Sequence, residues 1–285
     1  MKRVALIAIL ALAACDQQQG GAPVIRQDIS GDKVVDIGGE EATGPAGQSA
    51  AFSSDCTPHF FDQVLLTDCV ADPAKHAITT ALGPEGGAPF RSLKSYSETV
   101  VKDSVAFAMN AGMFDGDGKP IGYYVEESNR LNELNRADGE GNFYSTPNGV
   151  FYGSGNRWAV LATQSFYTNV LDRPEFGTQS GPMLVVDGEL HPDIKENGEA
   201  KAIRNGVGVD DEGRAHFVIS EAPVSFGVLA RFFRDELKID NALYLDGNVS
   251  ALWDPAKGRI DGGAPIGPLI VVTKKQTAPA ESPAP

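Results

Sequence analysis

This sequence of 285 residues is short of basic residues, cysteine and histidine, and each shortage excludes a class of function. Its 24 Lys and Arg residues stand against 38 Asp and Glu residues, which gives a formal net charge of −14. This charge argues against sequence-independent binding of nucleic acid, because such binding requires a basic surface. The three cysteines and four histidines show no spacing typical of a zinc site. The content of 42% hydrophobic residues indicates a globular chain.

Apart from the N-terminus, the sequence has no segment apolar enough to span a bilayer. There, Lys2 and Arg3 precede an apolar stretch from Val4 to Leu10, and Leu12-Ala-Ala-Cys15 follows. This order resembles a bacterial lipobox, in which Cys15 becomes the lipidated N-terminus. The alternative is an ordinary small-residue cleavage site with an incidental cysteine. The lipobox predicts a protein anchored to a bacterial membrane by lipid, facing the periplasm or the cell exterior.

Cys56 and Cys69 remain, and such a compartment permits disulfides. A bridge between them would close a short loop and stabilise the fold by roughly 3 kcal/mol in the chain-entropy model. Two buried free thiols are the alternative interpretation.

Composition divides the chain into four parts. Residues 1–14 are the predicted signal peptide, and residues 15–50, rich in Gln, Gly, Asp and Ala, are a flexible tether. Residues 51–272 are the folded domain. Residues 273–285, rich in Lys, Ala and Pro, are a tail predicted to be disordered.

Turn signals are dense within the folded part, and the strands between them are short. Helical spacing of apolar residues predicts a helix capped by Ser225 and ending near Leu237. We expect a single α+β domain with mixed β-sheets and flanking helices. The predicted strands are Ala106–Met109, Pro147–Tyr152, Trp158–Leu161, Pro182–Val186, Glu189–His191, Gly206–Val209 and Ala215–Ser220.

The predicted helix lies between a strand ending at Ser220 and a strand ending at Leu245. A strand–helix–strand unit makes its two strands parallel, so Glu221 and Asp246 should lie at the same edge of a sheet. Asn110 and Arg204 also occur at strand ends, and Gly247 allows the backbone or a ligand to come close to Asp246. These side chains predict a site for a polar, anionic ligand.

Four motifs in this region resemble those of the phosphodiester glycosidases, and most closely an uncharacterised bacterial periplasmic branch. They are Asn110-Ala-Gly-Met-Phe114, Gln179-Ser-Gly-Pro-Met-Leu-Val185, Arg204-Asn-Gly-Val-Gly208 and Leu245-Asp-Gly-Asn-Val-Ser250. Their common order makes the resemblance specific, although each motif alone is weak. The best-known animal member of that family has a Leu-Asp-Gly-Gly-Gly-Ser run, and Asn248 and Val249 stand here in place of two of its glycines.

The resemblance implies hydrolysis of a sugar-1-phosphodiester, and the residue types suit that chemistry. Arg204 would hold the phosphate with a bidentate fork. Asp246 would stabilise or attack the oxocarbenium-like anomeric carbon, and Glu221 or His216 would assist a water. Asn110 and Ser180 would orient sugar hydroxyls or phosphate oxygens. As purely structural alternatives, Asp246 would cap a turn and Arg204 would pair with a carboxylate. In the same way, Asn110 and Glu221 would belong to turns, and His216 would face solvent or a core partner.

The predicted function is therefore a membrane-anchored phosphodiester glycosidase acting on envelope or exported glycans. The alternative is a non-catalytic lipoprotein that binds glycan or phosphoglycan, and a metal-dependent phosphodiesterase is a third interpretation. The sequence requires no cofactor. Asp115-Gly-Asp-Gly118 has calcium-like chemistry but lacks the distal glutamate of an EF-hand loop.

Overall fold

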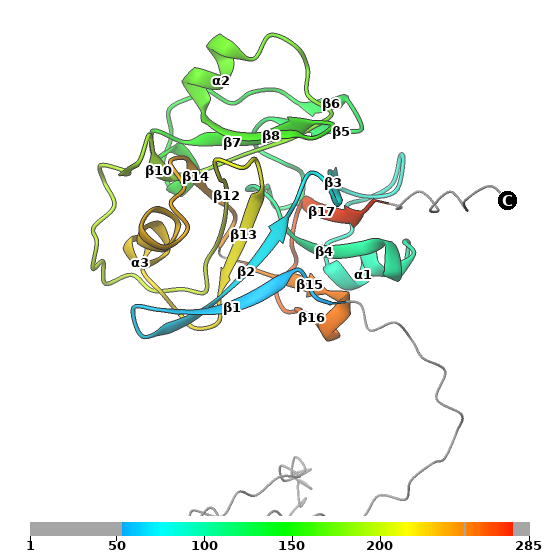
Figure 1. Ribbon diagram of the computed structural model, residues 1–285. Helices are drawn as coiled ribbons and strands as arrows, with labels where there is room; N and C mark the ends of the chain where they lie inside the picture. Colours follow the sequence, from blue (N-terminus) through cyan, green and yellow to red (C-terminus); the bar gives the residue numbers. More distant parts are fainter. Residues whose placement is uncertain (1–52, 248, 276–285) are drawn as a thin grey trace, which may run out of the picture. The chain divides into compact units, whose positions relative to one another are not determined.

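Three β-sheets form the framework of the structure, a computed structural model that describes residues 53–247 and 249–275 (Figure 1). The predicted signal peptide, Cys15 and the predicted tether lie outside the described residues. Every strand pairing in the sheets of this described part is antiparallel. Sheets with a few short helices confirm the predicted α+β class.

The largest sheet has seven strands and carries most of the motifs noted above. In spatial order they are β1 (Cys56–Phe61), β2 (Val64–Ala71), β13 (Ala215–Ser220), β12 (Asn205–Val209), β14 (Ala242–Tyr244), β10 (Met183–Val186) and β11 (Glu189–Leu190).

Two five-stranded sheets complete the fold. The first has the order β16 (Arg259–Ile260), β15 (Leu252–Asp254), β4 (Val105–Asn110), β17 (Leu269–Lys274) and β3 (His76–Ala81). The second has the order β6 (Asn129–Asn132), β5 (Tyr124–Glu126), β9 (Phe176–Ser180), β7 (Gly149–Ser154) and β8 (Arg157–Ala162).

Short helices cover the sheets: α3 lies beside β10 and β14, and α1 lies beside β4 (Figure 1). The Ser225 hydroxyl accepts a hydrogen bond from the Val228 N–H at 3.2 Å, which confirms the predicted N-cap. The helices are α1 (Leu93–Ser97), α2 (Thr163–Asn169), α3 (Phe226–Arg231), the 3₁₀ turns η1 (Lys102–Ser104), η2 (Asn142–Tyr144) and η4 (Pro255–Lys257), and the π-helical turn η3 (Phe232–Glu236).

An aromatic core joins all three sheets. Phe217 of β13 contacts Phe107 of β4 and Phe151 of β7, with ring centres 5.4 and 5.6 Å apart. Phe151 also contacts Phe176 of β9 at 5.3 Å. Strand β4 is buried along its whole length, which explains why its sequence is a continuous apolar run rather than an alternating one.

The predicted relation between the strands on either side of α3 is confirmed. Strands β13 and β14 each pair antiparallel with β12, so they run in the same direction. The sequence did not show that β12 lies between them. Because β12 lies between β13 and β14 and runs antiparallel to both, its first residues lie beside the C-terminal ends of these two strands.

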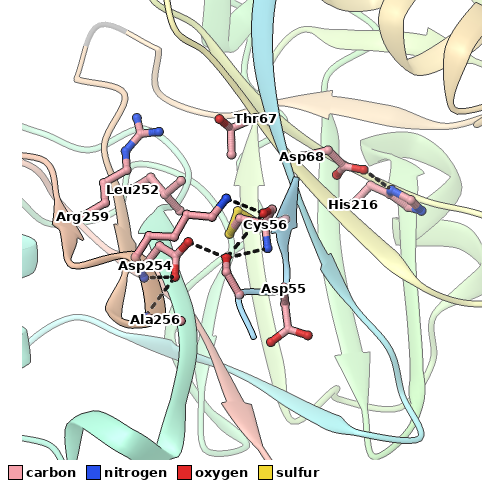
Figure 2. Close-up of a disulfide and its surroundings, with 12 residues drawn as sticks. Asp55, Cys56, Thr67, Asp68, His216, Leu252, Asp254, Ala256 and Arg259 are labelled. Atoms are coloured by element: carbon pink, nitrogen blue, oxygen red, sulfur yellow. Dashed lines mark hydrogen bonds and ion pairs between the residues drawn. A yellow bond between two sulfur atoms is a disulfide. The ribbon is translucent and has the colours of Figure 1, made fainter. Parts of the chain in front are cut away.

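The disulfide between Cys56 and Cys69 confirms the predicted bridge and links directly paired positions of β1 and β2 (Figure 2). At the other end of the chain, the predicted tail boundary is wrong. Thr273 and Lys274 belong to β17, because they pair with Ala77 and His76 of β3. No helix in the described part of the chain is long and apolar enough to cross a bilayer.

Candidate active site

The first residues of β12 lie beside the residues that follow β13 and β14, at one end of these three neighbouring strands of the seven-stranded sheet. Arg204 precedes β12, whereas Glu221 and Asp246 follow its two neighbours. The Leu245 N–H donates to the carbonyl of Asn205 at 3.1 Å, so the pairing continues up to Asp246. The sheet therefore brings together motifs that lie about 40 residues apart in the sequence.

Asn110 at the end of β4 holds the turn that contains Asp246. Its Nδ2 donates to the carbonyl of Asp246 at 2.8 Å, and its Oδ1 accepts from the Ala251 N–H at 2.9 Å. The Asp246 N–H donates in turn to the carbonyl of Ala111 at 3.1 Å. Both ends of this buried amide bind protein groups, so Asn110 fixes the turn rather than making the predicted contact with a sugar or phosphate.

Sequence reasoning missed Asn205 and Ser250, which complete this network. Asn205 Nδ2 donates to Asn110 Oδ1 at 2.9 Å. The Ser250 hydroxyl lies 3.0 Å from both Asn205 Oδ1 and the Ile203 carbonyl. Asn205 therefore connects the turn to β12 as well as to β4. The signals for these two residues in the sequence were their places in the motifs that begin at Arg204 and end at Ser250.

The Gln179-to-Val185 motif lies against the backbone that follows Asn110. The Gly112 N–H donates to Thr178 Oγ1 at 3.1 Å, and a Cβ at Gly112 would lie 2.1 Å from the Gln179 carbonyl oxygen. This close approach explains the glycine. Ser180 is 0% exposed and its hydroxyl has no hydrogen-bond partner among the described residues. The predicted contact between Ser180 and a substrate is therefore not available in this structure.

The guanidinium of Arg204 is 5% exposed and bound on several sides. Nε donates to the Val224 carbonyl at 2.9 Å, and one terminal nitrogen donates to the Ala200 carbonyl at 3.2 Å. The other terminal nitrogen donates to the Tyr244 hydroxyl at 2.9 Å. The group also lies 3.7 Å from the centre of the Phe226 ring. These contacts replace the predicted bidentate grip on a phosphate.

The Tyr244 phenol connects Arg204 to the turn. A Cβ at Gly247 would lie 2.0 Å from the Tyr244 hydroxyl oxygen, so only glycine fits there. Burial raises the pKa of Tyr244, the charge of Arg204 opposes that rise, and the charge of Asp246 adds to it. The phenol thus remains protonated beside Asp246. Sequence reasoning missed Tyr244, although alternation along a strand places residues 244 and 246 on one face.

A model of the phosphodiester glycosidase family matches residues 103–273, a range that contains all four motifs. The chain belongs to the phosphodiester glycosidase family. This is a family of hydrolases, so membership supports a hydrolytic function on phosphodiester-linked sugars.

Among curated proteins, the phosphodiester glycosidase chain described here is similar to the uncharacterized protein YigE of Escherichia coli (strain K12). The two are 38% identical over 149 residues, which are 52% of this chain and 58% of that protein. The matched region thus spans less than two thirds of that relative.

Two solved structures share the fold. The catalytic domain of zebrafish N-acetylglucosamine-1-phosphodiester alpha-N-acetylglucosaminidase, auto-inhibited by its pro-peptide, has a TM-score of 0.55 and 13% identity, over 81% of this chain and 86% of that one. A hypothetical protein from Synechocystis has a TM-score of 0.52 and 14% identity, over 77% of this chain and 62% of that one.

Glu221 lies at the predicted end of β13, next to the start of β12, but its carboxylate already binds other side chains. One carboxylate oxygen accepts from the Thr67 hydroxyl and lies against an Arg259 terminal nitrogen, both at 2.5 Å. Arg259 also contacts Asp261 at 2.8 Å. To act as a base on water, Glu221 would have to give up part of this ion pair, so its catalytic role stays a prediction.

A cavity of about 360 Å³ opens beside the turn, with Gly247, Ser250, Ile203 and Asp261 among its lining residues. Val249, one of the two departures from the family's glycine run, also lines it and packs against the apolar cluster around α1. The valine therefore has a packing role that anchors this side of the turn.

His216 does not reach the site, because it lies near the other end of β13. Its Nδ1 is 2.9 Å from Asp68 Oδ2 (Figure 2). Its Nε2 is 3.0 Å from Asp210 Oδ2. Burial lowers the pKa of His216, but the hydrogen bonds and charges of the two aspartates outweigh burial and raise it above its usual value. His216 therefore has the core partners of its structural interpretation and does not assist a water at the site.

The calcium-like loop closes on itself. Asp115 Oδ1 accepts from the backbone N–H groups of Asp117 and Lys119 at 3.0 and 2.9 Å. Within residues 53–247 and 249–275, no group of three or more His, Cys, Asp or Glu side chains is arranged to hold a metal ion.

Proposed function

We propose that this chain is a membrane-anchored phosphodiester glycosidase that hydrolyses a sugar-1-phosphodiester linkage in envelope or exported glycans. One observation carries the hydrolytic part. Motifs far apart in the sequence of a phosphodiester glycosidase meet through hydrogen bonds around the turn at Asp246. The name of the zebrafish relative, which specifies an N-acetylglucosamine-1-phosphodiester, supports the substrate class.

Asp246 is the catalytic residue in this proposal. Breaking the bond between the anomeric carbon and the phosphate oxygen develops positive charge on the sugar ring, and a carboxylate beside that carbon stabilises the charge or attacks the carbon. The departing phosphodiester oxygen is a weak base, so its departure needs less help from a general acid than in an ordinary glycoside. Water then adds its oxygen to the anomeric carbon as the hydroxyl of the free sugar, and its other proton goes to the released phosphate monoester or to solvent.

Arg204 and Tyr244 position Asp246 in this proposal. The guanidinium holds the phenol at 2.9 Å, and the phenol fixes the backbone at Gly247. A carboxylate in a turn held from several sides loses little freedom when a substrate binds, which favours a reactive geometry.

The anchor is proposed from the sequence order that precedes Cys15. Lipidation at this residue would place the domain at a membrane surface outside the cytoplasm, where envelope glycans occur. The expected result is that the full chain sediments with membranes and that Cys15→Ser releases it into the soluble fraction. Equal membrane association of both proteins would contradict the anchor without affecting the hydrolytic proposal.

Release of free N-acetylglucosamine from UDP-N-acetylglucosamine, and from an N-acetylglucosamine-1-phospho-sugar, tests the activity. Asp246→Asn removes the charge with little change in shape, and we expect a loss of at least about 100-fold in kcat. Asp211→Asn is the matched control, because Asp211 is an exposed carboxylate in the turn between β12 and β13. Equal rates for both variants would refute the role of Asp246.

The altered glycine run favours a second function, a lipoprotein that binds glycan or phosphoglycan without cleaving it. Saturable binding of the same substrates, with no sugar released during a long incubation, would establish this alternative in place of hydrolysis.

A further inference from the structure

A second cavity, of about 460 Å³, lies at β6 and α2. It shares no lining residue with the cavity beside Gly247. Its volume lies within the range of small-molecule sites, roughly 300–1,000 Å³. None of the four family motifs contributes to it, so the proposed hydrolysis does not explain it.

Aromatic rings form part of its wall. The rings of Tyr123 and Phe166 lie 5.0 Å apart and are mostly buried, whereas Tyr167 is 56% exposed. The Arg136 guanidinium lies 3.8 Å from the Tyr167 ring centre and restrains that ring. Leu171 at the rim is 90% exposed. An exposed tyrosine and leucine beside a cavity are typical of a ligand-binding groove.

The Tyr123 hydroxyl is a polar group at this cavity that no protein group binds within the described residues. Tyr123 is 5% exposed, and the part that remains exposed includes its hydroxyl, which reaches solvent. The charges closest to it belong to Arg130, Arg173 and Glu133, and all of these residues line the cavity. A polar group that reaches solvent in a cavity wall can exchange water for a ligand, so this hydroxyl is available to one.

The charged groups of the wall balance each other. Arg130 lies 2.9 Å from Glu133, Arg173 donates to the Ser128 carbonyl at 3.3 Å, and Asp172 supplies a second carboxylate. Each guanidinium has five N–H donors and keeps some of them free for a ligand. A wall with two cations and two anions does not favour a charged ligand. It offers many donors and acceptors to a neutral one.

We propose that this cavity binds a neutral saccharide. The apolar C–H face of a sugar ring would pack on an aromatic ring of the wall, as amphipathic tyrosines allow. Its hydroxyls would bond with Tyr123, the two arginines and the two carboxylates. Such a site would hold glycan units away from the bond that is cut, and it would bind them whether or not the chain is hydrolytic.

Calorimetry with two neutral trisaccharides, tri-N-acetylchitotriose and maltotriose, tests the site on the full chain. Tyr123→Phe removes only the unpartnered hydroxyl, so stability should not change, while loss of one hydrogen bond should weaken binding about fivefold. Tyr152→Phe is the matched control, because the Tyr152 ring contacts Phe166 without lining the cavity. Tyr167→Ala should weaken binding at least about tenfold, whereas Phe60→Ala, at an exposed ring on β1, should not.

Asp246→Asn separates this site from the proposed catalytic one, and binding of the trisaccharides should survive that substitution. Three results would overturn the proposal. They are no saturable binding of either trisaccharide, binding that Asp246→Asn abolishes but Tyr167→Ala leaves intact, and binding of glucose-1-phosphate alone. If sugar phosphates are not hydrolysed but the trisaccharides bind as described, only the hydrolytic proposal fails.

Discussion

Replacement of Arg204 by lysine separates a structural arginine from a phosphate-binding one. Lysine keeps the positive charge but has a single ammonium group in place of the planar fork. The guanidinium donates hydrogen bonds to Val224, Ala200 and Tyr244 from three different nitrogens, and an ammonium group can replace one of these bonds. If Arg204 held phosphate, the change would affect mainly the binding of substrate. Because Arg204 binds protein groups in this structure, we expect the change to lower the stability of the fold instead.

The expected loss of stability follows from these contacts. Two of the three charge-assisted hydrogen bonds would be lost, each contributing about 1.5–3 kcal/mol. Contact with the Phe226 ring at 3.7 Å adds about 1 kcal/mol. Interactions within one site are not additive, and water or local movement compensates in part. We therefore expect Arg204→Lys to lower the free energy of unfolding by about 3 kcal/mol.

Urea denaturation followed by tryptophan fluorescence measures this change, because Trp158 and Trp253 are both buried. The thermal midpoint should fall by about 6–12 °C. Arg157→Lys is the matched control at an exposed arginine, and it should stay within about 0.5 kcal/mol of the original protein. If Arg204→Lys behaves like this control while raising KM, Arg204 binds substrate and our interpretation of its contacts is wrong.

Other predictions concern the network, the disulfide and pH. Asn205→Ala should lower kcat on the order of 100-fold by releasing the turn, and kinetics that match the original protein would contradict this. Joint replacement of Cys56 and Cys69 by serine should lower the free energy of unfolding by about 3 kcal/mol, again measured in urea. His216, whose pKa is raised in the fold, stabilises the fold fully below its unfolded pKa of about 6.5, and this stabilisation disappears as pH rises through the folded value. The stability difference between the original protein and His216→Gln should shrink in that window, and a growing difference would refute the assignment.

The sequence was informative about local structure, and least informative about which strands become neighbours. The continuous apolar run of β4, the Ser225 cap and the Asp187-Gly188 turn between β10 and β11 all follow from local rules. The insertion of β12 between β13 and β14 does not, because it depends on pairing between distant segments. The end of β17 was missed for the same reason: Thr273 and Lys274 are polar, and their pairing with β3, together with that of Thr273 with β4, marks them as strand.

Roles at the site were harder to predict than the place of the site. Asp246 and Gly247 could be identified from the sequence, because the carboxylate stands at the end of a strand and the glycine after it allows another group to come close. The sequence could not show that Asn110 and Arg204 point toward protein partners, because a polar side chain near a strand end can turn either way. Tyr244 was overlooked because a tyrosine in an apolar strand usually belongs to the core. Here its ring is buried while its hydroxyl lies against Gly247.

A crystal structure of the Asp246→Asn protein with UDP-N-acetylglucosamine is the most direct test of the proposed catalytic centre. The substitution slows turnover and so preserves the bound substrate. We predict that the anomeric carbon lies within about 3.5 Å of the side chain at position 246. A substrate bound elsewhere, with that side chain turned away from the sugar, would contradict the proposal.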